Sequence, residues 1–429
     1  MRTCIRRSLF VVLSICSICS AAGALDKKTA SDIDREIEKS RAELIKVRRF
    51  IHMNPQLPGR EGETAKLISG RLQALGLEVR TGVGRTGLVA VLHGAQPGAM
   101  IALRADMDAD PVQELADVPF KSLNAGVMHA SGHDLHTTIG LGTAMVLAAL
   151  RDRLHGGVKF IFQPGDENNP GEDGGSALLI KEGVLDNPPV VAVFGLRIWP
   201  ETLGQAFLAS GPFLASSDDF RVQIRGKSGS AQEGSDAIAL AAQAILGLQT
   251  LFARLSDPTE PIQLNIGRLE AGAKADTVAE RAAFEGVVRT LSENSRKRIP
   301  RAMEAAIKGI VQALGGDATF GFEQDVPPVY NHPELLDLMR PSFDEALGEK
   351  KLIDIKPQMT ADDFGRYGQK VPSLFFFLGS RNPRLQPAVP LRSPYFNPDE
   401  RTISVGIKVM SHLLINCLDQ QSGVDKSNR

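Results

Sequence analysis

The chain has 429 residues, 43% of them hydrophobic, and a formal net charge of −1 at pH 7. A chain of this length can bury a large core, and two domains are the natural expectation. No basic excess is present to neutralise phosphates, and only 5% of the residues are aromatic. The composition therefore argues against nucleic acid and anionic membranes as partners.

The first 24 residues have the pattern of a secretory signal peptide. Three arginines precede an apolar run that starts at Leu9, and Ala22 and Ala24 form a small-residue pair before the expected cleavage point. The run is short for a membrane span, so no stable membrane insertion is expected after cleavage; an uncleaved anchor is the alternative. Only Cys417 of the four cysteines lies beyond this segment, which leaves no internal disulfide. We expect a periplasmic or secreted protein.

Helical patterns and short apolar runs alternate along the next part of the chain. Helices are predicted over residues 30–51, 64–76 and 138–154. Strands are predicted over residues 88–94, 100–108, 158–163 and 190–198. Runs that are apolar throughout are typical of a sheet covered on both faces, and chemistry in such sheets gathers at the carboxyl ends of the strands.

From residue 218 the order of elements changes. A strand, a helix, two strands, a helix and a strand are predicted at 218–226, 235–255, 261–271, 282–291, 295–316 and 317–326. This βαββαβ order is that of the split ferredoxin-like unit. After Pro327 the first pattern resumes, with a buried strand at 372–379. The prediction is an α/β, mostly parallel-sheet catalytic-type domain with an inserted ferredoxin-like α+β lid. Its parts are 1–24 (signal peptide), 25–214 and 327–420 (catalytic-type domain), 215–326 (lid) and 421–429 (disordered tail).

Two polar clusters directly follow predicted buried strands. Asp106 and Asp108 lie on one face at a strand end, where two carboxylates repel unless a cation lies between them; capping the next segment is their alternative role. Asp166 and Glu167 follow the next strand. Adjacent carboxylates on a turn can have different roles: one binds a metal, and the other accepts a proton from water. The alternative for this pair is an ordinary acidic loop.

The segment HASGHDLH, residues 129–136, is the strongest local motif. If it is helical, His129, His133 and His136 share a face; if it is a loop, His133 and Asp134 point inward. Imidazoles and carboxylates are the usual zinc ligands. For any one of these histidines, the alternative is a buried hydrogen-bonding role.

These motifs, in this order and with the inserted domain, resemble the zinc-dependent amidohydrolases of the aminoacylase and carboxypeptidase superfamily. The hippurate hydrolases of bacteria and the auxin-conjugate hydrolases of plants are the most similar groups. The motifs that carry the resemblance are RADMDA (104–109), GVMHASGHDLHT (126–137), FQPGDE (162–167) and SPYFNPDE (393–400). The resemblance implies a centre of two zinc or two manganese ions and a lid that often mediates homodimers. It also implies N-acyl amino acids or small peptides as substrates, cleaved at the amide bond.

Carried over residue by residue, the resemblance implies a changed metal centre. His133 and Glu167 match metal ligands of the family. The other three expected ligands, a bridging thiolate and two histidines, are replaced here by Ser131, Arg197 and Arg392.

The resemblance also identifies the residues expected around this centre. Asp166 stands where the family has its general-base glutamate, and with Asp108 it is a candidate catalytic residue. Ser230 replaces the lid histidine that polarises the scissile carbonyl, and Asp276 replaces an asparagine of the substrate loop. Arg289 is a candidate clamp, with the two substituted arginines, for a substrate carboxylate.

A guanidinium stays protonated and has no lone pair to offer a metal. We therefore expect Arg197 and Arg392 to supply the charge of the missing ions and to neutralise the remaining carboxylates. The alternative is an alignment error of one helical turn, with both side chains in solvent. Three functions stay open: a hydrolase with one unusual metal ion or none, a catalytically silent binder of an acyl amino acid, peptide or partner protein, and a structural, dimer-forming protein.

Overall fold

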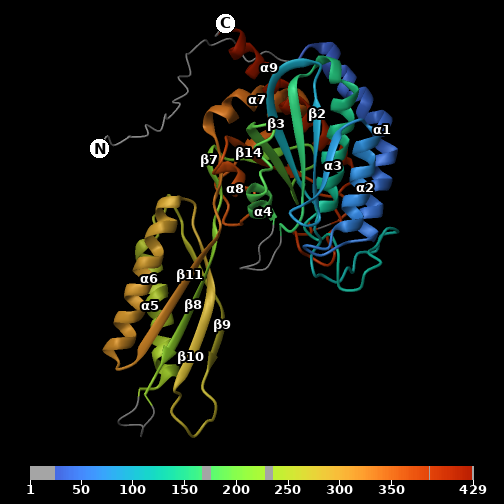
Figure 1. Ribbon diagram of the computed structural model, residues 1–429. Coiled ribbons are helices and arrows are strands. Elements are labelled where there is room, and N and C mark those ends of the chain that lie inside the picture. The colour runs from blue at the N-terminus through green and yellow to red at the C-terminus, as the bar shows by residue number, and fades with distance from the viewer. Residues whose placement is uncertain (1–24, 167–174, 228–234, 386, 428–429) are drawn as a thin grey trace, which may run out of the picture.

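The computed structural model describes residues 25–166, 175–227, 235–385 and 387–427. Within this range the chain forms a larger α/β part and a smaller α+β part that extends away from it (Figure 1). The predicted signal peptide lies outside the described residues, and so do Glu167 and Ser230.

An eight-stranded sheet forms the centre of the larger part, in the order β1-β2-β4-β3-β5-β14-β6-β13. The strands are β1 (Glu78–Val83), β2 (Gly87–His93), β3 (Gln96–Asp106), β4 (His155–Gln163), β5 (Val190–Trp199), β6 (Ala206–Leu208), β13 (Leu352–Asp354) and β14 (Ser373–Gly379). The four central strands, β4, β3, β5 and β14, run parallel to their neighbours in this group. Their carboxyl ends therefore meet along one edge of the sheet.

Helices cover this sheet, which explains the unbroken apolar runs of strands such as β14, buried at every residue. The helices are α1 (Lys27–Met53), α2 (Gly62–Ala74), α3 (His133–Ala149), α4 (Gly175–Lys181), α7 (Pro333–Leu347), α8 (Gly365–Gly368) and α9 (Arg401–Ser427), with a short 3-10 turn at Arg151–Arg153. Helices α3 and α9 pack directly on β3, and α1 packs on both of them. Helix α9 includes most of the segment that the sequence predicts to be a disordered tail.

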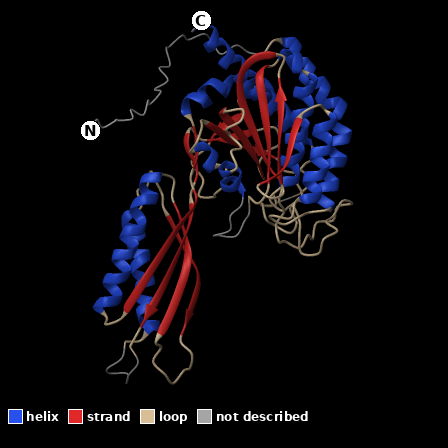
Figure 2. Cartoon of the chain, viewed as in Figure 1, coloured by secondary structure: helices blue, strands red, loops and turns tan. Residues whose placement is uncertain are grey.

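The smaller part has the predicted βαββαβ order. Its elements are β8 (Ser217–Arg225), α5 (Ala237–Leu255), β9 (Gln263–Ala271), β10 (Arg281–Arg289), α6 (Glu293–Ala313) and β11 (Asp317–Val326). The antiparallel sheet has the order β11-β8-β10-β9, which is the ferredoxin-like arrangement. Both helices lie on one side of this sheet (Figure 2). The predicted fold class is therefore confirmed, whereas the exact domain boundaries stay a prediction.

The smaller part has a hydrophobic core of its own. Phe220, Phe284, Ile299 and Met303 are among its buried side chains. Helix α5 is the one helix among the described residues that is long and apolar enough to cross a membrane by length and composition, and it packs on the lid sheet. A short ladder of β7 (Gly211–Leu214) and β12 (Val329–Asn331) lies where the chain enters and leaves this part.

Candidate active site

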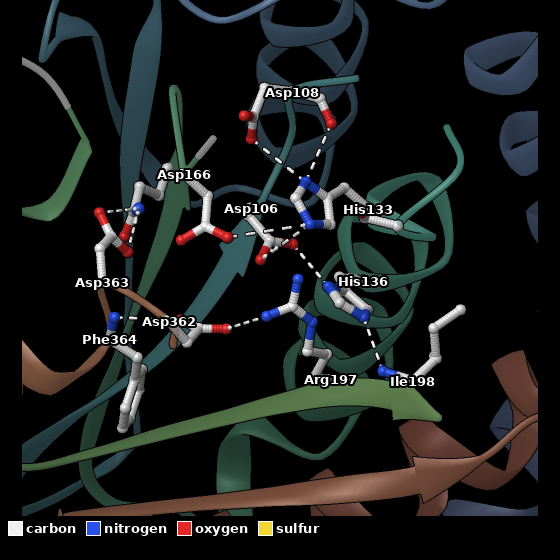
Figure 3. Close-up of polar contacts among 12 residues, drawn as sticks. Asp106, Asp108, His133, His136, Asp166, Arg197, Ile198, Asp362, Asp363 and Phe364 are labelled. Atoms are coloured by element: carbon white, nitrogen blue, oxygen red, sulfur yellow. Dashed lines mark hydrogen bonds and ion pairs between the residues drawn. The ribbon is translucent and has the colours of Figure 1, made fainter. Parts of the chain in front are cut away.

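The carboxyl ends of the central strands bring the predicted site residues together (Figure 3). Asp106 is the last residue of β3, and Asp108 follows two residues later. His133 is the first residue of α3, and Arg197 lies near the end of β5. Asp166 lies three residues beyond the end of β4. These five side chains come from segments far apart in the sequence and converge on one buried cluster.

The HASGHDLH segment combines its two predicted forms: residues 129–132 form a turn, and helix α3 begins at His133. Gly132 has φ +80°, and a Cβ atom there would lie 2.0 Å from the Cδ1 atom of Ile198. Glycine is thus required at this position on two counts. His133 points into the cluster (Figure 3). Asp134 pairs instead with buried Arg48 at 2.8 Å.

His133 is held through one ring nitrogen and leaves the other facing carboxylates. Its Nδ1 lies 2.9 Å from the backbone oxygen of Asp108, an acceptor only, so Nδ1 carries a proton. Its buried Nε2 has no hydrogen bond within the described residues and lies 3.7 Å from Asp106 Oδ2 and 3.9 Å from Asp166 Oδ2. Burial disfavours the charged ring, but the carboxylates of Asp106, Asp108 and Asp166 together outweigh it and raise the pKa of His133 well above its usual value.

His136 has both ring nitrogens in use. Its Nδ1 lies 2.6 Å from Asp106 Oδ1, and its Nε2 accepts the backbone N–H of Ile198 at 2.8 Å. Because a backbone N–H can only donate, Nε2 is unprotonated and Nδ1 donates to the carboxylate. Burial lowers the pKa of His136. This histidine therefore positions Asp106, and its lone pair is not available to a metal.

Arg104 is a central cation of the cluster, and sequence reasoning did not select it. This buried guanidinium bonds to Asp106, and its Nη2 lies 2.6 Å from Asp166 Oδ1, 2.9 Å from Asp363 Oδ1 and 3.4 Å from Asp362 Oδ1. Arg104 stands inside the RADMDA motif, so its position was visible in the sequence. Its partners Asp362 and Asp363 lie more than 250 residues away, and spacing cannot reveal such contacts.

The crowding of carboxylates shifts their pKa values in opposite directions. Burial raises the pKa of Asp362 to about 7, with Asp166 adding to the effect. Burial also acts on Asp166, but the charge of Arg104, a hydrogen bond with Asp363 and the charge of His133 together outweigh it and lower the pKa of Asp166 to about 2. A carboxylate with so low a pKa is a weak base, because its ionised form is already stabilised by its partner.

The two arginines at expected ligand positions lie at different depths. Arg197 is buried, and its Nη1 lies 3.3 Å from Asp362 Oδ2 and 3.2 Å from the backbone oxygen of Ala361. Arg392 has φ +62° and a side chain that is 58% exposed, with its Nε 3.8 Å from Asp110 Oδ1. The structure thus places Arg197 inside the cluster and Arg392 at its rim.

Ser131 is buried and bonded to a carboxylate that the sequence did not point to. Its hydroxyl donates to Asp110 Oδ1 at 2.9 Å, and its backbone N–H donates to Asp110 Oδ2 at 2.8 Å. Asp110 thus contacts both Ser131 and Arg392, two of the substituted positions. Asp110 lies two positions after Asp108 in the sequence, and this spacing could have identified it as a candidate site residue.

The remaining predicted residues lie outside the cluster. Asp276 is exposed, in the segment between β9 and β10. Arg289, at the end of β10, donates to the backbone oxygen of Met359 at 3.2 Å. Burial, with the nearby charge of Arg392, lowers the pKa of Arg289. His129 is fully buried, neither ring nitrogen has a hydrogen-bond partner in the described chain, and burial lowers its pKa to about 3.

A tryptophan marks the edge of the site. Trp199 ends β5, two residues beyond Arg197, and is the one tryptophan of the sequence. Its ring stacks on that of Phe377 in β14, with the ring centroids 4.2 Å apart and the planes 2° from parallel. The stack fixes the end of β5 against its neighbour.

Among the described residues, the donor groups of the site fit one divalent cation. Two overlapping groups of candidate metal ligands occur among the described residues: Asp106, His133 and His136, and Asp106, Asp166 and Asp362. His136 has no free nitrogen, and guanidinium groups contact the carboxylates of the second group. Within the described chain, His133 Nε2 is the imidazole nitrogen that could bind a metal, facing Asp106 and Asp166, after the metal displaces its proton. Two ions would need further donors, and Glu167, which matches a metal ligand of the family, lies outside the described residues.

The fold and the site define a class: hydrolases with a carboxylate and imidazole centre at the carboxyl ends of a mostly parallel sheet, and with an inserted ferredoxin-like domain. The model of Peptidase family M20/M25/M40 matches residues 102–416, and the chain belongs to this family. By this resemblance it is a hydrolase of amide bonds, as the sequence motifs predict.

Relatives align with most of the chain. An N-acyl-L-amino acid amidohydrolase of Geobacillus stearothermophilus is 37% identical over 310 residues, covering 71% of this chain and 82% of that protein. IAA-amino acid hydrolase ILR1-like 4 of Arabidopsis thaliana is 32% identical over 396 residues, covering 90% and 88%. The structure of the YXEP protein of Bacillus subtilis, described as a dinuclear metal-binding peptidase, is similar with a TM-score of 0.79 and 31% identity, covering 89% and 99%.

Proposed function

We propose that this chain is an exported member of the amidohydrolase group that binds an N-acyl amino acid or a small peptide and lacks the family's two-metal centre. The observation that carries the proposal is Arg197, a permanent cation buried in the cluster 3.3 Å from Asp362. Like charges repel strongly in a poorly hydrated site, so this guanidinium disfavours a dication beside it. The substrate class is that of the named relatives.

Hydrolysis at this centre is expected to be slow or absent. Asp166, at the general-base position, is ion-paired with Arg104, and its pKa of about 2 makes it a poor proton acceptor. A metal ion normally lowers the pKa of the attacking water by several units, and without it the rate falls by orders of magnitude. The same two facts favour the second candidate function, a catalytically silent binding protein.

Carboxylate recognition is the part of the proposal that does not need a metal. Arg392 at the rim and Arg289 at the end of β10 lie close enough for their charges to interact. Two neighbouring guanidinium groups are a good match for a carboxylate, which accepts two hydrogen bonds. We therefore infer that they bind the carboxylate of the acyl amino acid.

Metal analysis of the purified mature protein, combined with an activity screen on hippurate-like amides, tests the proposal. We expect at most one equivalent of zinc or manganese and little or no release of amino acid. The matched control is the triple variant Ser131→Cys, Arg197→His, Arg392→His, which restores the family's ligand types and is expected to bind more metal. About two equivalents in the unmodified protein, with rapid hydrolysis, would refute the proposal.

Binding and residual catalysis are separated by two further measurements. Binding of N-benzoylglycine without turnover supports the silent binder. Turnover that survives a strong chelator and is lost in Asp166→Asn supports a hydrolase that works without metal.

Export and pairing of chains are also part of the proposal. The leader pattern of residues 1–24 supports a periplasmic or secreted location.

Ile238 and Leu246 of α5 and Leu269 of the edge strand β9 are 49%, 60% and 53% exposed, and such apolar side chains favour a homodimer through the lid. A Leu246→Glu variant that remains a dimer in sedimentation analysis would argue against this interface.

A further inference from the structure

The residue that follows the predicted leader is held within the fold. Ala24 is the last residue of the predicted leader, and Leu25 is half-buried against the main hydrophobic core. Asp26 is the N-cap of α1 and accepts hydrogen bonds from the backbone of Lys28 and Thr29 at 3.0 and 2.9 Å. The chain is therefore anchored from its first expected mature residue onward.

The backbone nitrogen of Leu25 is held by a carboxylate from a distant helix. It donates to Glu345 Oε2, in α7, at 3.1 Å across 320 residues of sequence. The other oxygen of this side chain, Oε1, is buried and has no hydrogen bond to any described residue. His412 of α9, 1% exposed, lies behind it with Nδ1 3.5 Å from Oε2. Three helices thus meet at this carboxylate, which is left with an unused acceptor.

The charge of Glu345 needs a cation at this position. The residue lies in the last turn of α7, where the helix carbonyls carry partial negative charge, and that turn has no basic residue. His412 is the salt-bridge partner within 4 Å in the described chain, but burial lowers the pKa of His412 and favours its neutral form. A single peptide N–H is a weak substitute for a full positive charge.

We propose that Glu345, backed by His412, is a binding site for the α-ammonium group of a mature chain that begins at Leu25. This inference rests on the proposed export. A leader-cleaving endopeptidase hydrolyses the bond between Ala24 and Leu25 with one water; Ala24 leaves as a carboxylate, and the new amine of Leu25 takes up a proton. The ammonium then has three donors where the peptide had one, enough to reach both oxygens of Glu345.

The position of this ammonium explains why a dedicated partner is present. A positive charge just before α1 is unfavourable, because the helix N-terminus carries partial positive charge. The first turn of α1 has no acidic residue to offset it. Asp26, the next residue, is committed to capping the helix, and Glu345 is the carboxylate that accepts from the nitrogen of Leu25.

Two forms of the protein test the site by thermal unfolding, without any substrate. One form begins at Leu25 with a free amine, and the other carries a single glycine before Leu25. The free-amine form is expected to have a Tm about 2–4 °C higher, because its ammonium pairs with a partly buried carboxylate. In Glu345→Gln the difference between the two forms is expected to disappear. Equal Tm values in the parent protein, or a difference that survives in Glu345→Gln, would overturn the proposal.

Two further measurements do not depend on the folding of a variant. N-terminal sequencing of the exported protein is expected to start LDKK; a different first residue contradicts the site. The α-amine of folded protein is expected to react with cyanate at pH 7.5 several-fold more slowly than that of a peptide with the same start, because the ion pair keeps it protonated. Equal reaction rates contradict the site even if the protein binds N-acyl amino acids.

Discussion

At the scale of single side chains, the buried cluster contains more carboxylates than cations, so one cation contacts several carboxylates. Arg104 alone contacts Asp106, Asp166, Asp362 and Asp363. Removing one partner from a buried ionic group leaves charges without compensation, which costs far more than the loss of a surface pair. The cluster is therefore stable only as a set.

Replacing Arg104 by methionine is expected to lower the free energy of unfolding by about 3–5 kcal/mol, because several buried carboxylates lose their counter-ion. Urea denaturation measures the change. Arg41→Met in α1 is the control, since Arg41 is 45% exposed and its pair with Glu38 is at the surface; its effect should stay below about 0.5 kcal/mol. Similar values for both variants would show that the cluster does not depend on Arg104.

Asp219 in the lid gives a pH-dependent prediction away from the cluster. Burial, with the nearby charge of Asp325, raises the pKa of Asp219 to about 6. A raised pKa in the folded state means that stability is lost as pH rises from about 4 through 6. Asp219→Asn should therefore be more stable than the parent protein at pH 7.5 and equally stable below pH 4. Exposed Asp117→Asn, measured alongside by thermal unfolding, should show no such pH-dependent gain.

At the scale of elements, the junction between the HASGHDLH turn and α3 determines where His133 points. Gly132 makes this junction with a positive φ angle and direct packing against β5. Because Gly132 has no side chain, the turn and the start of α3 can pack directly against Ile198 of β5.

Gly132→Ala is expected to lose about 2–4 kcal/mol of stability, from the strained φ angle and from overlap with Ile198. Gly126→Ala is a matched control: Gly126 has φ +75°, but a Cβ atom there meets nothing within 4 Å. The control should show the conformational cost alone, about 1 kcal/mol. Equal losses in denaturant unfolding would mean that the contact with Ile198 relaxes freely.

The sequence predicts the long elements because their patterns are strong. The apolar runs of β4, β5 and β14 and the order of the lid elements are all found where the pattern places them. Strands β6, β7, β12 and β13 have three or four residues each, too few to show a period, and β1 is mostly exposed. Among site residues, Asp106, Asp108 and Asp166 at the strand ends were predicted. Arg104 and Asp110 were missed, and Asp362 and Asp363 join the site only through tertiary contacts.

At the scale of the whole molecule, the rim of the site is shared between the two parts of the chain. Arg289 belongs to the lid, and Arg392 belongs to the larger part. Their charges interact across the junction of these parts. A ligand carboxylate held by both would link the lid to the sheet on which the cluster is built.

Arg289→Gln and Arg392→Gln are each expected to weaken binding of N-benzoylglycine by about 10-fold, because each removes one charge-assisted hydrogen bond. Titration calorimetry measures the affinities. The amide of the same ligand, which lacks the carboxylate, should bind the parent and both variants equally weakly. If the variants bind the acid as tightly as the parent, the two arginines do not recognise the carboxylate.

The stack of Trp199 on Phe377 gives the molecule an internal optical reporter. With one indole in the chain, all tryptophan emission arises two residues from Arg197, at the edge of the candidate site. A ligand or cation that enters the cluster changes the electric field and water content around this ring, so its fluorescence intensity and wavelength shift with occupancy. Dissociation constants can therefore be read from unlabelled protein, whether or not any bond is cleaved.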